Sequence, residues 1–76
     1  MSEWYRNHLD EKVTALAISD NLRFWVQMRE RAGGSGYPAE FFRWNLRDAQ
    51  KAADRLVQAY HPHECQESRC GQWRKS

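Results

Sequence analysis

The feature that most constrains this chain is a periodic apolar pattern between Pro38 and Tyr60. Its apolar residues recur at steps of four and three positions, at Phe42, Leu46, Ala49, Ala53, Leu56 and Tyr60. That spacing places them on one side of an α-helix. Pro38 suits a first helical turn, and Pro62 ends the helix because a proline cannot donate the backbone hydrogen bond. The pattern predicts a long helix over residues 38–60 whose apolar side packs against other helices.

Two shorter helices are predicted before it, over residues 2–18 and about 21–32. Ser19, Asp20 and Asn21 are all good helix N-caps and indicate a break between them, although one continuous helix is an alternative. A second alternative begins a new helix at Asn45, which is also a good cap. The expected fold class is all-α: a small three-helix bundle over residues 1–60, followed by an irregular His/Cys tail over residues 61–76.

The chain is short for a protein without extra stabilisation. A domain of 76 residues buries only about 60% of the surface that its unfolded chain exposes. Self-association, a metal or a disulfide usually compensates. The sequence contains four Trp, three Tyr and three Phe, which is more aromatic surface than so small a core easily hides, and this favours a partner or a homodimer.

The remaining composition excludes some functions. A formal net charge of +2 is too small to make attraction of the whole molecule to nucleic acid the default interpretation. No apolar run reaches the about 20 residues of a membrane-spanning helix, and the first residues lack the apolar core of a signal peptide. We therefore expect a cytoplasmic protein without membrane contact.

The tail brings together residue types that bind metals. His61, His63, Cys65 and Cys70 lie within ten residues, and two His with two Cys is a ligand set of structural zinc. Their spacing differs from that of the usual pairs, which are separated by two to four residues, so the residues do not match a zinc-binding motif. Zinc is a candidate cofactor because of the residue types alone. A Cys65–Cys70 disulfide and a tail with reduced, unbound cysteines are the alternatives.

The predicted long helix also carries a basic ridge. Arg43, Arg47, Lys51 and Arg55 are spaced by four residues and share one side of such a helix. Asp48 and Asp54 are placed to pair with these cations, which would make the ridge an ordinary solvated surface. The functional interpretation is a contact surface for a partner, formed by Phe41, Arg43, Trp44, Arg47, Lys51 and Arg55.

The sequence predicts a small non-catalytic protein-binding module, such as a regulator, inhibitor or assembly factor. The alternative is a nucleic-acid-binding accessory protein that uses the basic ridge and stacks an unpaired base on Trp44 or Phe41. Catalysis is not expected, because His63 and Cys65 in a tail lack the rigid, buried setting that activates a nucleophile.

Overall fold

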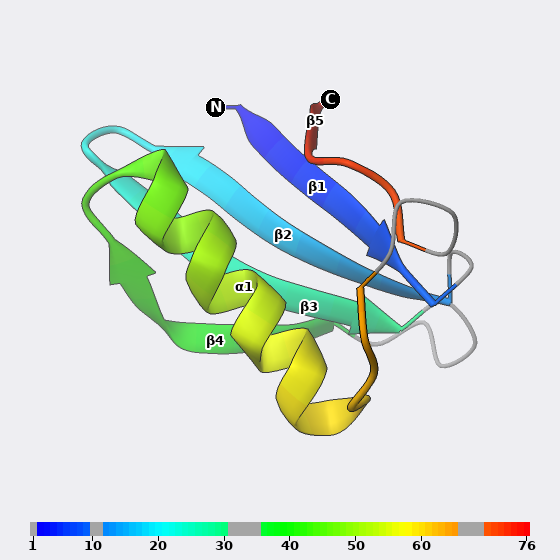
Figure 1. Ribbon diagram of the computed structural model, residues 1–76. Helices are drawn as coiled ribbons and strands as arrows, with labels where there is room; N and C mark the ends of the chain where they lie inside the picture. Colours follow the sequence, from blue (N-terminus) through cyan, green and yellow to red (C-terminus); the bar gives the residue numbers. More distant parts are fainter. Residues whose placement is uncertain (1, 10–11, 31–35, 66–69) are drawn as a thin grey trace.

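The computed structural model describes residues 2–9, 12–30, 36–65 and 70–76, with the side chains of residues 36–41 left out of the description. It contains an antiparallel β-sheet and one long helix, so the predicted all-α three-helix bundle is wrong (Figure 1). In chain order, the elements are β1 (Glu3–His8), β2 (Val13–Asp20), β3 (Arg23–Glu30), β4 (Gly36–Arg43), α1 (Leu46–Tyr60) and β5 (Arg74–Lys75).

The first four strands form a meander in which each strand pairs with the next. The order across the sheet is β4-β3-β2-β1-β5, and all pairs are antiparallel. The tail returns after the helix and adds β5 beside β1, where Trp4 pairs with Lys75 and Tyr5 with Arg74. The segment predicted to be an irregular tail therefore ends as an edge strand.

The break predicted at residues 19–21 is a β-hairpin turn and not a helix boundary. Asp20 pairs with Arg23, which leaves Asn21 and Leu22 as the two turn residues. Asn21 has a φ of 55°, a left-handed conformation that asparagine tolerates and that two-residue hairpins require. The same residue types serve as helix caps and as turn formers, and here the turn is formed.

The predicted long helix is correct only from Leu46 onward. Residues 36–43 form β4, and the Asn45 side chain caps α1 by accepting a hydrogen bond of 2.9 Å from the Asp48 N–H. The alternative start at Asn45 is therefore the observed one. Pro38 lies in β4, an edge strand, where a missing N–H donor is tolerated.

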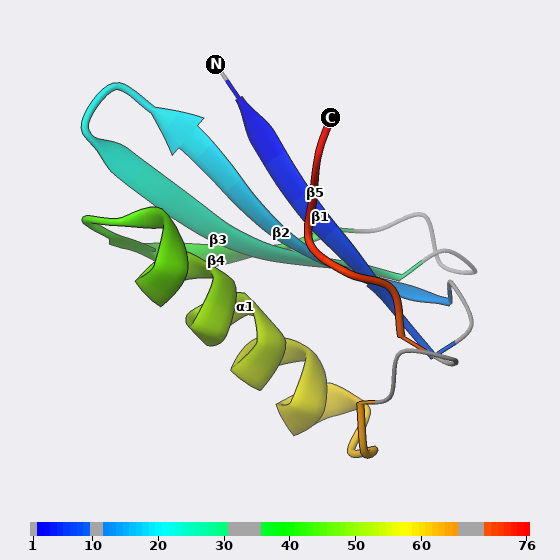
Figure 2. The same cartoon turned by 45° about the horizontal axis from the view of Figure 1, so that its top comes forward.

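The apolar side of α1 packs on one face of the sheet, against β2 and β3 (Figures 1 and 2). Ala49, Ala52, Ala53 and Val57 are buried there, and Leu46 and Leu56 are partly buried. Two members of the predicted apolar side do not join them: Phe42 belongs to β4, and Tyr60 is 57% exposed. Among the described residues, no helix is long and apolar enough to cross a membrane.

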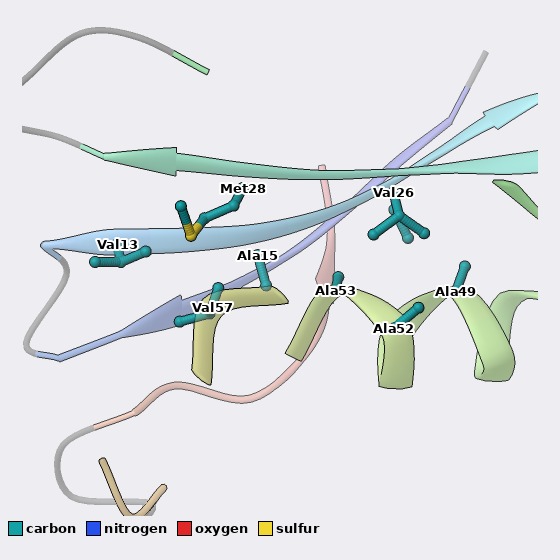
Figure 3. Packing of buried hydrophobic residues seen from close by; sticks show 9 residues of the cluster. Val13, Ala15, Val26, Met28, Ala49, Ala52, Ala53 and Val57 are labelled. Carbon is teal, nitrogen blue, oxygen red and sulfur yellow. The ribbon is translucent and has the colours of Figure 1, made fainter. Parts of the chain in front are cut away.

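The core between helix and sheet is built mainly from small side chains (Figure 3). From the sheet, it takes Val13, Ala15, Ala17, Val26 and Met28. These residues alternate along β2 and β3, so they share the face toward α1. Alanines on both sides bring helix and sheet close together but bury little apolar area per residue.

Candidate metal centre

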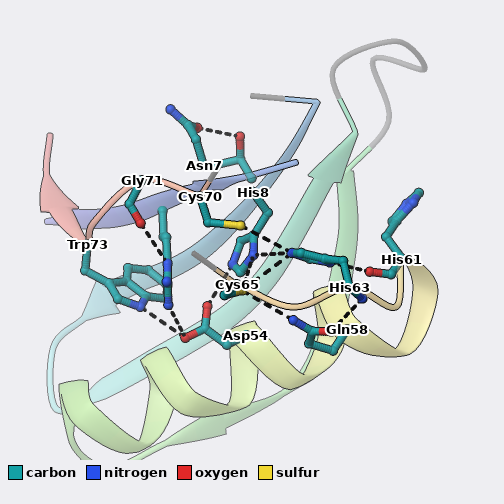
Figure 4. Close-up of polar contacts among 12 residues, drawn as sticks. Asn7, His8, Asp54, Gln58, His61, His63, Cys65, Cys70, Gly71 and Trp73 are labelled. Carbon is teal, nitrogen blue, oxygen red and sulfur yellow. Dashed lines mark hydrogen bonds and ion pairs between the residues drawn. The ribbon is translucent and has the colours of Figure 1, made fainter. Parts of the chain in front are cut away.

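Four metal-binding side chains converge where the end of β1 meets the chain that follows α1 (Figure 4). They are His8, His63, Cys65 and Cys70, and their ligand atoms all lie within 4.8 Å of one another. His8 and Cys70 are buried, and His63 and Cys65 are partly buried. We call these four residues the His/Cys cluster.

Four of the six distances between ligand atoms in the His/Cys cluster are close to the edges of a tetrahedral site, and all six are at most 4.8 Å. His8 Nδ1 lies 3.2 Å from His63 Nε2 and 3.2 Å from Cys65 Sγ. His63 Nε2 lies 3.5 Å from Cys65 Sγ and 3.4 Å from Cys70 Sγ. Zn–N bonds of about 2.0–2.1 Å and Zn–S bonds of about 2.3 Å, arranged tetrahedrally, separate ligand atoms by about 3.3–3.8 Å. The residues present therefore fit a four-coordinate zinc ion.

Asp54 on α1 fixes the orientation and tautomer of His8. His8 Nε2 lies 2.9 Å from Asp54 Oδ1. Because a carboxylate only accepts hydrogen bonds, Nε2 carries the proton and donates it. In the neutral ring, the other nitrogen, Nδ1, then has a lone pair that points into the cluster.

His63 is oriented in the same way by the backbone. Its Nδ1 is hydrogen-bonded to the carbonyl oxygen of His61, which can only accept, so Nδ1 carries the proton. His63 Nε2 therefore also presents a lone pair, 3.2 Å from the lone pair of His8 Nδ1. When both rings are neutral, the two acceptors repel at that distance unless a shared proton or a metal ion lies between them. Outer hydrogen bonds that fix both histidines in this way are typical of metal ligands.

The two sulfur atoms have different surroundings. Gln58 on α1 donates a hydrogen bond of 3.3 Å from Nε2 to Cys65 Sγ. Burial raises the pKa of the Cys65 thiol, and the hydrogen bond and charge of Cys70 raise it further, whereas the charge of Arg6 and the Gln58 hydrogen bond lower it. Two thiolates side by side thus require a cation that takes the place of their protons. Neither cysteine forms a disulfide.

Asp54 also joins the cluster to the rest of the fold. Its Oδ2 accepts hydrogen bonds of 3.3 Å from Arg6 on β1 and from Trp73 in the tail. Arg6 Nε donates a second hydrogen bond, of 2.9 Å, to the Gly71 carbonyl, and the Gly71 N–H donates to the Asn7 carbonyl at 2.7 Å. One carboxylate therefore links the first strand, the helix and the tail.

Three of the four proposed zinc ligands, His63, Cys65 and Cys70, lie together in the structure. The fourth, His61, lies elsewhere: its Nε2 is 2.8 Å from Glu30 Oε1 on β3. His8 takes its place in the cluster, and sequence reasoning missed it. The available signal was that structural zinc sites usually combine two pairs from separate segments, and His8 is the only His outside the tail.

The proposed contact residues do not form one line. Arg43 belongs to β4, whereas Arg47, Lys51 and Arg55 lie on α1 with exposed side chains. Trp44 is 68% exposed and contacts the ring of Phe42, with 5.0 Å between the ring centroids. The side chain of Phe41 is outside the described part of the structure.

Comparison with known proteins gives no relative from which a function could be transferred. No protein-family model, no curated protein and no solved structure matches this chain.

Proposed function

We propose that this chain is a small non-catalytic binding module whose fold is held by a structural zinc ion at His8, His63, Cys65 and Cys70. The observation that carries the metal proposal is the pair of lone pairs at His8 Nδ1 and His63 Nε2, 3.2 Å apart. A proton on one imidazole would relieve the repulsion between the two nitrogens, but it would not bind the two sulfur atoms. A cation at the centre of the cluster would accept both lone pairs and both sulfurs.

The ligand set supports zinc in a structural role. Two sulfurs and two imidazole nitrogens in tetrahedral arrangement are the preferred surroundings of Zn²⁺. Four protein ligands leave no coordination position for a substrate or a reactive water, in contrast to catalytic zinc sites with three protein ligands. The ion would instead hold the tail on β1 and α1, which suits a chain whose core is made of small side chains.

The binding role rests on the exposed side chains of α1 and on Trp44. Binding to another protein, as a regulator, inhibitor or assembly factor, stays a prediction. So does a homodimer.

Elemental analysis of the untagged, full-length chain tests the metal proposal. The chain is purified under reducing conditions, and we expect one zinc per chain. Replacement by Co²⁺ should give the visible absorption of a tetrahedral cobalt site with thiolate ligands. Zinc that is absent or far below one per chain in folded protein contradicts the proposal.

Matched variants test which residues bind. His8→Gln and Cys70→Ser each remove one ligand and should reduce zinc content or change the cobalt spectrum. His61→Gln is the control, because the His61 side chain contacts Glu30 and not the cluster, and the substitution keeps the backbone carbonyl that is hydrogen-bonded to His63. Equal loss of zinc in His61→Gln and His8→Gln would contradict the ligand assignment.

A further inference from the structure

One flank of α1 points toward β1 and the tail, and two of its residues define that direction. Asp54 contacts His8, Arg6 and Trp73, and Gln58 contacts Cys65. Side chains three or four residues apart lie on the same side of a helix. Lys51 and Arg47 precede Asp54 by three and seven residues, so they continue this flank toward the start of α1.

The sheet beside this flank is not covered by the helix. α1 packs on β2 and β3, whereas β1 and β5 form the part of the sheet to one side of the helix (Figures 1 and 2). Trp4 and Trp73 are partly buried against the core on this side, and Lys75 Nζ lies 5.9 Å from the centre of the Trp4 ring. We define the cationic ledge as Trp4, Arg47, Lys51, Trp73 and Lys75.

The acidic residues predicted to neutralise the helix cations are occupied elsewhere. Asp54 binds Arg6 and His8, and Asp48 accepts a hydrogen bond of 2.8 Å from the Asn45 side chain. Arg47, Lys51 and Lys75 are exposed, and none of them forms an ion pair with another described residue. The ledge thus combines two indole rings with three cations that have no ion-pair partner in the described part of the chain.

From this combination, we propose that the cationic ledge binds single-stranded nucleic acid. Phosphates would contact Arg47, Lys51 and Lys75, and an unpaired base would stack on an exposed part of Trp4 or Trp73. A duplex fits less well, because its bases cover one another and offer no free face to an indole. The proposal rests on the proposed zinc site, because Trp73 and Lys75 follow Cys70 and are held beside α1 by the clustered tail.

Fluorescence anisotropy with a labelled oligothymidine of about 12 nucleotides tests the proposal on the zinc-loaded full chain. We expect binding at low salt, with log K falling against log salt with a slope of about −2 for three phosphate contacts. Arg47→Glu and Lys51→Glu should each weaken binding by about tenfold or more, because each removes one cation and adds an anion. Absence of binding at low salt overturns the proposal.

Arg29→Glu is the matched control. Arg29 is an exposed arginine on β3, and it alternates with the core residue Met28, so it lies on the sheet face away from α1. It undergoes the same charge change and should alter affinity by less than about twofold. A loss of affinity equal to that of Arg47→Glu would mean that net charge alone drives binding. That result would overturn the assignment of the binding site to the cationic ledge.

Two further measurements separate the possible failures. Zinc content is determined for every variant. Weaker binding by Arg47→Glu or Lys51→Glu with full zinc content supports the ledge, whereas a zinc-loaded wild-type chain that does not bind contradicts the ledge and leaves the metal proposal standing. A wild-type chain that binds the oligonucleotide without any zinc contradicts the metal proposal instead. A polyglutamate peptide of equal charge serves as competitor for the labelled oligothymidine. If it displaces the label as effectively as unlabelled oligothymidine does, the ledge favours an acidic protein partner, and the nucleic-acid assignment is overturned.

Discussion

The two regions that hold this fold together use opposite chemistry. Between α1 and the central strands, the contact is apolar and built largely from alanine and valine. Between β1, the end of α1 and the tail, it is polar and built from His8, Arg6, Asp54 and the residues that follow the helix. The apolar region needs only the chain itself, whereas the proposed zinc ion would complete the polar region. A short chain can thus keep a fifth strand without a larger hydrophobic core.

Metal removal should show the largest difference between the two regions. Apparent binding free energies of structural zinc are about 10–16 kcal/mol in small peptides, comparable with the about 5–15 kcal/mol that stabilises a whole domain. We expect chelation to lower the melting temperature strongly and to expose residues 61–76 to proteolysis before the sheet. Unchanged melting after complete chelation would show that the apolar region alone stabilises the fold.

Met28→Ala tests the apolar region. Met28 is fully buried between sheet and helix, and truncation of a buried methionine to alanine costs about 2–5 kcal/mol. Urea denaturation should give this loss in the zinc-loaded protein, with zinc stoichiometry unchanged. Met28→Leu, which conserves volume, is the control and should cost less than about 1.5 kcal/mol.

Asp54→Asn tests the link between the two regions. The substitution keeps the size of the side chain but removes the charge that orients His8 and accepts from Arg6. Loss of such an outer hydrogen bond lowers metal affinity by about 10–100-fold. Competition with a zinc chelator measures this change, and Asp48→Asn, at an exposed position of the same helix, should leave the affinity unchanged.

Asn45→Ala should have the smallest effect. It removes the N-cap of α1 and should cost about 1 kcal/mol in the free energy of unfolding. Because Asn45 lies at the opposite end of α1 from Gln58, zinc affinity should not change. Asn45→Ser retains a capping oxygen and should restore most of the stability in the same denaturation experiment.

The sequence allowed the helix from Leu46 to Tyr60 to be predicted because its apolar residues follow one period. The strands were missed because their alternation is hidden. In β2, Val13, Ala15 and Ala17 face the helix, but Leu16 on the other face is only 1% exposed. In β1, the residues that face the helix include Arg6 and His8, which are polar because they serve the cluster. An apolar run in one strand and polar inward residues in another both conceal a period of two.

The residue types of the candidate metal site were predictable from the sequence, but the full set of four ligands was not. His63, Cys65 and Cys70 are close in sequence, so composition alone pointed to them. The position of His8 depends on the pairing of β1 with β2 and on the return of the tail, which are long-range features that no local pattern encodes. His61 was favoured by its proximity to His63, yet its side chain turns toward Glu30.

The distribution of the four ligands along the chain also sets an order of events during folding. One ligand comes from the first strand and three come after the helix, so the cluster cannot form until the sheet, the helix and the returning tail have all been assembled. Such distant contacts form late and slowly, because a long loop must close before they contribute. A nascent chain that ends before Cys70 would lack one of the four ligands, and capture of the proposed ion would mark the end of folding and not its beginning.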